Sequence, residues 1–75
     1  MEDKLVFDYS KLKGRIREKF GNNYNFAKEL GCNNSTLSLK LNNQSEFSQK
    51  EIFTAIRILN LNESDIPDYF FAVIV

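Results

Sequence analysis

Apolar residues recur at one-turn intervals along most of this chain, which is the pattern of amphipathic helices. Leu12, Ile16 and Phe20 are each four residues apart and predict a helix with one core-facing stripe. Ser10 is its expected N-cap, because a serine hydroxyl accepts hydrogen bonds from the first turn. Gly21 follows the last apolar position and is the expected stop, because glycine readily adopts the left-handed conformation that ends helices.

Residues 22–43 predict two short helices joined by a tight turn, and this stretch is the expected functional centre. Asn22 is the expected cap of the first helix, and Asn33 or Asn34 that of the second. Gly31 lies between them and favours a sharp change of direction. The spacing is that of a helix-turn-helix: the small residue Ala27 is followed by Gly31 four positions later and by Leu37 six positions after that. The apolar stripes are Phe26, Ala27 and Leu30, then Leu37 and Leu41.

The clearest local signal opens the fourth predicted helix. Ser48 and Glu51 have the spacing of a capping box, in which each side chain accepts from the other residue's backbone. The helix that follows is apolar on more than one side, because Phe53 and Ile58 fall outside its main stripe. Such a helix either lies deep in a bundle or contacts another chain. The main stripe is Ile52, Ala55, Ile56 and Leu59.

The two ends of the chain carry short apolar segments. Residues 5–7 suit either an edge strand or a packed arm. Asn62 is the expected cap of a short fifth helix, which Pro67 limits because the residue before proline avoids helical geometry. Tyr69 and Phe70 are the residues of this segment expected to cover the core. Residues 73–75 favour extended structure, so pairing with a second copy and a frayed end both remain open.

These elements predict an all-α fold, a five-helix bundle with short extended termini, and one domain over residues 1–75. Scarce glycine and proline, three and one, favour helices over a turn-rich β fold. A lone cysteine excludes an internal disulfide, and a metal site is not expected because histidine is absent. With no charged leader and no apolar run of membrane-spanning length, the chain is expected in the cytoplasm, without a membrane partner.

Enzymatic activity is not expected. Without histidine, neither a Ser-His-Asp nor a Cys-His arrangement can form, and no glycine-rich phosphate loop is present. We therefore expect no cofactor and no small-molecule substrate. The expected partners are macromolecules.

Charge is distributed unevenly although the formal net charge is zero. Residues 9–41 contain seven basic and two acidic residues, whereas residues 42–75 contain two basic and five acidic ones. A neutral total disfavours strong non-specific DNA binding, which depends on cationic contacts to phosphate. The basic front half keeps that role open, although a solvated helix surface explains the same charges.

The outward face of the third predicted helix carries short polar side chains that can reach base edges in a major groove. The same residue types also suit an ordinary solvent face. Asn23, in the first turn of the preceding helix, is a candidate phosphate clamp or simply part of the turn after Gly21. The outward residues are Asn34, Ser35 and Ser38, with Leu39 and Asn42 beside them.

Several phrases carry a family resemblance over most of the chain. FAKELG, followed after five residues by leucine, and FSQKEI resemble the Cro and repressor DNA-binding domains of temperate bacteriophages. FDYSKLKGRIREKFG, TLSLKLNN and DIPDYFF resemble small single-domain phage regulators from Gram-positive hosts. The resemblance implies a lambda-repressor or Cro-like helix-turn-helix domain that acts in the lysis–lysogeny switch of a phage or prophage.

In such domains the third helix enters the major groove and the second helix grips the backbone. By position, Asn34, Ser35 and Ser38 match the groove-facing places, and Asn23 matches the phosphate clamp. Asn42 or Lys40 would touch the backbone beyond the helix. The resemblance thus implies a homodimer on operator DNA, with half-sites about one helical turn apart.

A second interpretation is an antirepressor. The resemblance also extends to small phage proteins that modulate a co-encoded repressor by binding its DNA-binding domain. Leu39 stands where a polar base reader is common, and the neutral charge is low for a tight operator binder. A third interpretation is a domain of this shape that binds only protein. The candidate protein-interface residues are Leu39, Phe53, Ile58, Val73 and Ile74.

Overall fold

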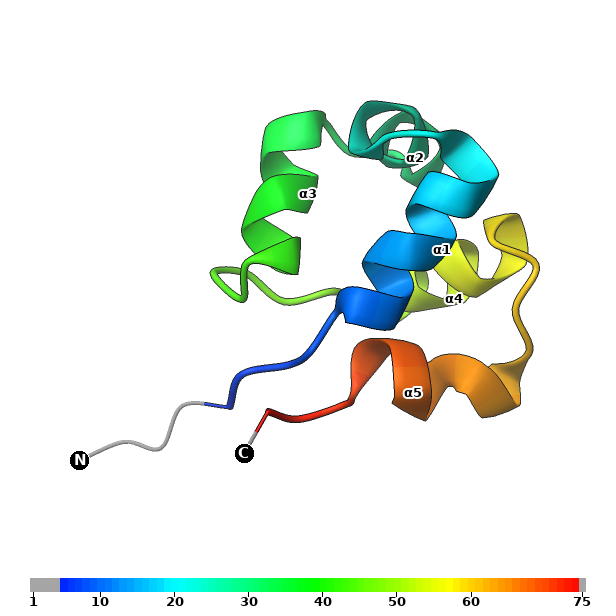
Figure 1. Ribbon diagram of the computed structural model, residues 1–75. Helices are drawn as coiled ribbons and strands as arrows, with labels where there is room; N and C mark the ends of the chain where they lie inside the picture. The colour runs from blue at the N-terminus through cyan, green and yellow to red at the C-terminus, as the bar shows by residue number, and fades with distance from the viewer. Residues whose placement is uncertain (1–4, 75) are drawn as a thin grey trace.

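The computed structural model describes residues 5–74, and within them the fold is all-α with five α-helices (Figure 1). The helices surround one core, and α5 lies across the bottom of the bundle in the view of Figure 1. A single 3-10 turn, Glu63–Asp65, precedes α5. The helices are α1 (Ser10–Phe20), α2 (Asn23–Leu30), α3 (Asn34–Leu41), α4 (Gln49–Ile58) and α5 (Ile66–Phe70).

Helix α1 begins differently from the prediction. Ser10 is its first residue and Tyr9 its N-cap, so the predicted capping role of Ser10 is wrong. The Asp8 carboxylate lies two residues earlier and accepts from the Ser10 backbone N–H at 3.0 Å and from the Ser10 hydroxyl. These bonds lower the pKa of Asp8, because they favour its charged form. The Ser10 hydroxyl was expected to accept a hydrogen bond at the start of this helix, but it donates one, and the Asp8 carboxylate is the acceptor.

The caps of α2 and α3 confirm the predicted pair of short helices. The Asn22 side chain accepts from the Asn25 N–H at 2.9 Å, and the Asn33 side chain accepts from the Thr36 N–H at 2.8 Å. Gly31 ends α2 with φ of 98°, a left-handed conformation that costs other residues about 1 kcal/mol or more. Asn33, rather than Asn34, is thus the cap of α3.

Helix α4 starts with the predicted capping box. The Ser48 N–H donates to the Glu51 carboxylate at 2.8 Å, and the Glu51 N–H donates to the Ser48 hydroxyl at 3.1 Å. Pro67 departs from expectation. It lies in the first turn of α5, whose first residue is Ile66, so the helix continues through the proline instead of being limited by it. Proline suits this position because the first turn has no intrahelical acceptor for its missing N–H.

The core receives side chains from all five helices, and the largest fully buried ones include Phe26 and Phe70. Phe70 lies edge-on to Phe47 with ring centroids 5.2 Å apart, and Phe26 lies similarly against Phe20 at 5.5 Å. These contacts confirm the expectation that Phe70 covers the core. The buried apolar residues are Tyr9, Leu12, Ile16, Phe26, Ala27, Leu37, Leu41, Ala55, Ile56, Leu59 and Phe70.

The two end segments lie side by side (Figure 1) and pair with each other. Phe7 and Val73 form an antiparallel bridge, with Ile74 N–H donating to the Val6 carbonyl at 2.8 Å. Residues 5–7 are thus a packed arm. The tail over residues 73–74 pairs with the arm of its own chain rather than fraying, while residue 75 lies outside the described part.

Asn43 fastens the arm to the end of α3. Its side-chain oxygen accepts from the Phe7 N–H at 2.8 Å, and its amide donates to the Phe7 carbonyl at 3.0 Å. The amide thereby imitates a neighbouring strand. Asn43 has a φ of 64°, which asparagine tolerates better than most residues.

Candidate functional site

A polar groove of about 450 Å³ lies where α1, the start of α2 and α3 meet. It brings Asn23, Asn34 and Ser38 together with two cations of α1, Lys13 and Arg17. Three of the six residues predicted to contact DNA therefore share one concave surface. Gly21, Asn22 and Tyr24 complete its lining.

Two further predicted DNA contacts are exposed but lie outside the lining of that groove. Ser35 is in the first turn of α3, and Asn42 is the residue that ends this helix. Leu39 is 46% exposed on the same helix, so α3 presents an apolar side chain beside its polar ones. The exposed surface of α3 is therefore mixed rather than uniformly polar.

Lys40 corrects the prediction most clearly. It was expected at the DNA backbone but is only 7% exposed. Its Nζ donates to the Glu46 carbonyl at 2.8 Å, pairs with the Glu51 carboxylate at 3.0 Å and lies 5.8 Å from the Phe47 ring centroid. An ammonium group held by these partners is not available to phosphate. Lys40 joins α3 to the start of α4 instead.

The contacts around Lys40 also shift the pKa of Glu51, the carboxylate in the capping box of α4. Burial raises the pKa of Glu51, but hydrogen bonds from the Ser48 backbone and the Lys40 ammonium outweigh it. The net effect is a pKa below the ordinary value of 4.5. Glu51 is therefore charged at neutral pH and serves both the helix cap and the ion pair.

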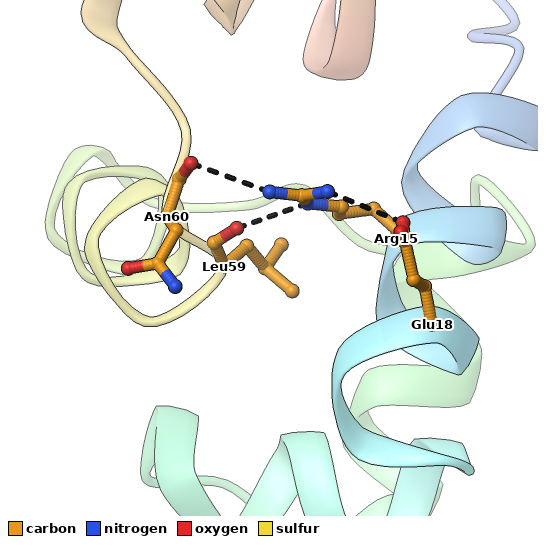
Figure 2. Close-up of polar contacts among 4 residues, drawn as sticks. All are labelled: Arg15, Glu18, Leu59 and Asn60. Carbon is orange, nitrogen blue, oxygen red and sulfur yellow. Dashed lines mark hydrogen bonds and ion pairs between the residues drawn. The ribbon is translucent and has the colours of Figure 1, made fainter.

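Arg15 is a second cation used inside the fold, and sequence reasoning counted it only as surface charge. Its Nε donates to the Leu59 carbonyl at 3.0 Å and a terminal nitrogen donates to the Asn60 carbonyl at 3.4 Å (Figure 2). The other terminal nitrogen pairs with Glu18 at 3.2 Å. The guanidinium thus satisfies free carbonyls at the negative end of α4, where a cation is favoured.

Replacing Arg15 with alanine is expected to lower the free energy of unfolding by about 1–2 kcal/mol, because two helix-end carbonyls lose a charged donor. Arg17 on the same helix is exposed and serves as the matched control. Its alanine variant is expected within about 0.5 kcal/mol of wild type. Urea unfolding measures both, and equal losses would contradict the helix-capping role.

A second hollow of about 450 Å³ lies between α4 and the end of α5, and it is mainly apolar. We call it the α4–α5 groove. Phe53 and Phe71 line it and are 53% and 52% exposed, so Phe53 is accessible to a partner chain. Ile58, the other interface candidate on this helix, is partly buried and packs against the core. The remaining lining residues are Gln49, Ile52, Ile56, Glu63 and Ile66.

Val73 and Ile74 are exposed on the paired tail, as their role as interface candidates requires. Phe71 was missed as a surface residue. The sequence places it in a run of apolar residues, where only the end of α5 decides which ring turns inward. Within residues 5–74, no three metal-ligating side chains cluster, and no helix is long and apolar enough to cross a membrane.

Residues 5–73 match the sequence profile of a family described as a protein of unknown function (DUF739). The chain belongs to this family. A similar solved structure is the solution structure of the modulator of repression (MOR) of the temperate bacteriophage TP901-1 from Lactococcus lactis. The two sequences are 49% identical, the match covers 87% of this chain and 88% of that one, and the TM-score is 0.77. No curated protein matches the chain significantly.

The DUF739 match includes all five helices, the N-terminal arm and the first residue of the paired tail. Both the polar groove and the α4–α5 groove therefore lie within the matched residues. The predicted similarity to small phage regulators is confirmed by the TP901-1 relative.

Proposed function

We propose that this chain regulates the lysis–lysogeny switch of a temperate phage or prophage by binding the co-encoded repressor. The observation that carries this proposal is the 49% identity, over nearly nine-tenths of both chains, to a phage modulator of repression. In this role the chain binds the DNA-binding domain of the repressor and keeps it from its operator. It acts as a binding protein and not as an enzyme.

The use of charge supports a protein partner. Lys40 and Arg15, two of the seven basic residues in the front half, are engaged within the fold. A neutral net charge leaves little excess positive charge to bind phosphate, and cationic contacts to phosphate supply most non-specific DNA affinity. The exposed phenylalanine side chains Phe53 and Phe71 supply the apolar anchors that protein interfaces use. The balance favours the antirepressor interpretation.

Operator binding through a Cro-like helix-turn-helix formed by α2 and α3 is the second candidate function. The polar groove supports it, because Lys13, Arg17 and Asn23 can face a phosphate while α3 faces the bases. In this role the chain binds as a homodimer. Replacing Asn34 or Ser35 with alanine would then reduce discrimination between operator and random DNA, by about 1 kcal/mol or more.

A mobility shift with the phage's own promoter DNA tests the proposal against this candidate. We expect the chain to release the co-encoded repressor from the operator, and to form a repressor complex in size-exclusion chromatography. The chain alone is expected to leave the operator unshifted at the same concentration. Tight operator binding by the chain alone, with steep salt dependence and no repressor complex, would establish the DNA-reading function instead.

A further inference from the structure

The α4–α5 groove is one half of a longer apolar surface. A neighbouring hollow of about 470 Å³ lies between the N-terminal arm and the loop before α4. The two hollows share Ile52 and Phe71, so they form one surface, which we call the α4–α5 band. Leu5 borders it at the arm and Phe53 at α4, and both side chains are more than half exposed.

Exposed aromatic rings at the centre of an apolar surface have the character of binding anchors. Phe53 and Phe71 each leave about half of their surface in water although both border the same groove. Fully burying an exposed phenylalanine side chain contributes roughly 1.5–3 kcal/mol, and because each ring is already about half buried, each can add about half of that on binding. Phe71 also meets Phe7 edge-on at 6.0 Å, which orders the ring before any partner arrives.

The band is bordered by negative charge. Glu46 lines one hollow and Glu63 lines the other, and within residues 5–74 neither carboxylate forms an ion pair. Two cations lie beside the band: the Arg57 guanidinium is 5.8 Å from the Phe53 ring centroid, and the Lys40 ammonium, already paired with Glu51, is 5.8 Å from that of Phe47. Glu46 and Glu63 thus give the border of the band a negative charge that favours a cationic partner surface.

We propose that the α4–α5 band, and not α3, binds the DNA-binding domain of the repressor. A domain that binds operator DNA presents cationic side chains toward phosphate. Glu46 and Glu63 are placed to pair with those cations while Phe53 and Phe71 cover apolar side chains beside them. Repressor bound here cannot hold DNA with the same residues, which accounts for loss of repression by direct competition. The inference rests on the proposed function.

The test measures the affinity of the purified co-encoded repressor for the full chain by calorimetry. Phe53→Glu is expected to weaken binding by about 30-fold, the effect of losing an interface anchor worth roughly 2 kcal/mol. Glu63→Lys is expected to weaken binding several-fold, with less effect at high salt. The matched control is Leu39→Glu, because Leu39 is exposed to a similar degree on α3. It is expected to stay within about twofold of wild type.

Circular dichroism and melting curves show whether each variant is folded. Because Glu63 is exposed, Glu63→Lys is expected to fold, and it still tests the proposal if Phe53→Glu unfolds. Loss of binding in Leu39→Glu, with both band variants at wild-type affinity, would overturn the inference and leave the proposed function standing. A homodimer of the chain alone that Phe53→Glu dissociates would also overturn it. Wild-type chain that does not bind the repressor would contradict the proposed function itself.

Discussion

Replacing Phe70 with alanine is expected to lower the free energy of unfolding by about 3–5 kcal/mol, the largest effect of any single change considered. The ring is 2% exposed and contributes from the last turn of α5 to a core shared by all five helices. Its removal takes away apolar burial, the edge-on contact with Phe47 and the packing that holds α5 to the bundle. A domain of this length has only roughly 4–11 kcal/mol in total.

The measurement is thermal unfolding followed by circular dichroism. A loss of this size lowers the melting temperature by about 15 °C or more. Phe71→Ala is the matched control, because the neighbouring ring is 52% exposed and loses chiefly its contact with Phe7. That variant is expected to lose about 1 kcal/mol. Similar melting temperatures for the two variants would contradict the assignment of Phe70 as the inward ring.

Replacing Lys40 with methionine is expected to lower the free energy of unfolding by about 2 kcal/mol at pH 7. Methionine keeps most of the stem but leaves Glu51 without its ion pair and the Glu46 carbonyl without its donor. Breaking a buried pair typically costs roughly 3–5 kcal/mol, which we reduce because 24% of the Glu51 side chain is exposed. Urea unfolding of the wild type and the variant measures the difference.

The pH dependence of this loss follows from the lowered pKa of Glu51. A carboxyl whose pKa is depressed on folding stabilises the protein above its unfolded value, here 4.5, and less as pH falls through the folded value. The difference between wild type and Lys40→Met is therefore expected to be constant from pH 7 to about 5 and to shrink below about 4.5. A difference that does not change down to pH 3 would show that the ion pair does not contribute.

Glu51→Gln supplies the matched control for the same pair. Glutamine can still accept from the Ser48 N–H, so the helix cap is retained while the charge is lost. In the double variant the two losses are expected to be less than additive, because each single change already breaks the one ion pair. Full additivity would show that Lys40 stabilises the fold through its packing against Phe47 rather than through the ion pair with Glu51.

Local signals predicted most of the helical framework because the physics behind them is local. The capping box at Ser48 and the turn at Gly31 depend on residues within one turn, and both are present in the structure. The same locality explains the errors at α1 and α5. Asp8 competes with Ser10 for one helix start, and Pro67 can either stop or start a helix. The choice depends on packing of the segments beyond them.

The candidate surfaces could be predicted only in part. Helix periodicity places Asn34 and Ser38 on the outward face of one helix, and Asn23 lies in the first turn of the helix before it. The structure brings all three into one groove. Lys40 and Arg15 could not be separated from exposed cations, because their acceptors come from the loop before α4 and from its far end. Phe71 likewise becomes a surface anchor only where α5 ends beside α4.

By itself, the sequence determined the five helices, most of their caps and the uneven distribution of charge, since each depends on composition or on contacts within a few residues. Tertiary structure alone decided which cations bind acceptors within the fold and which aromatic rings are exposed to solvent. It also paired the arm with the tail, through Asn43 and the Phe7–Val73 bridge. The Asn43–Phe7 and Arg15–Leu59 contacts join residues 36 or more positions apart, and the Lys40 contacts join two different elements, so no local pattern carries information about the partner.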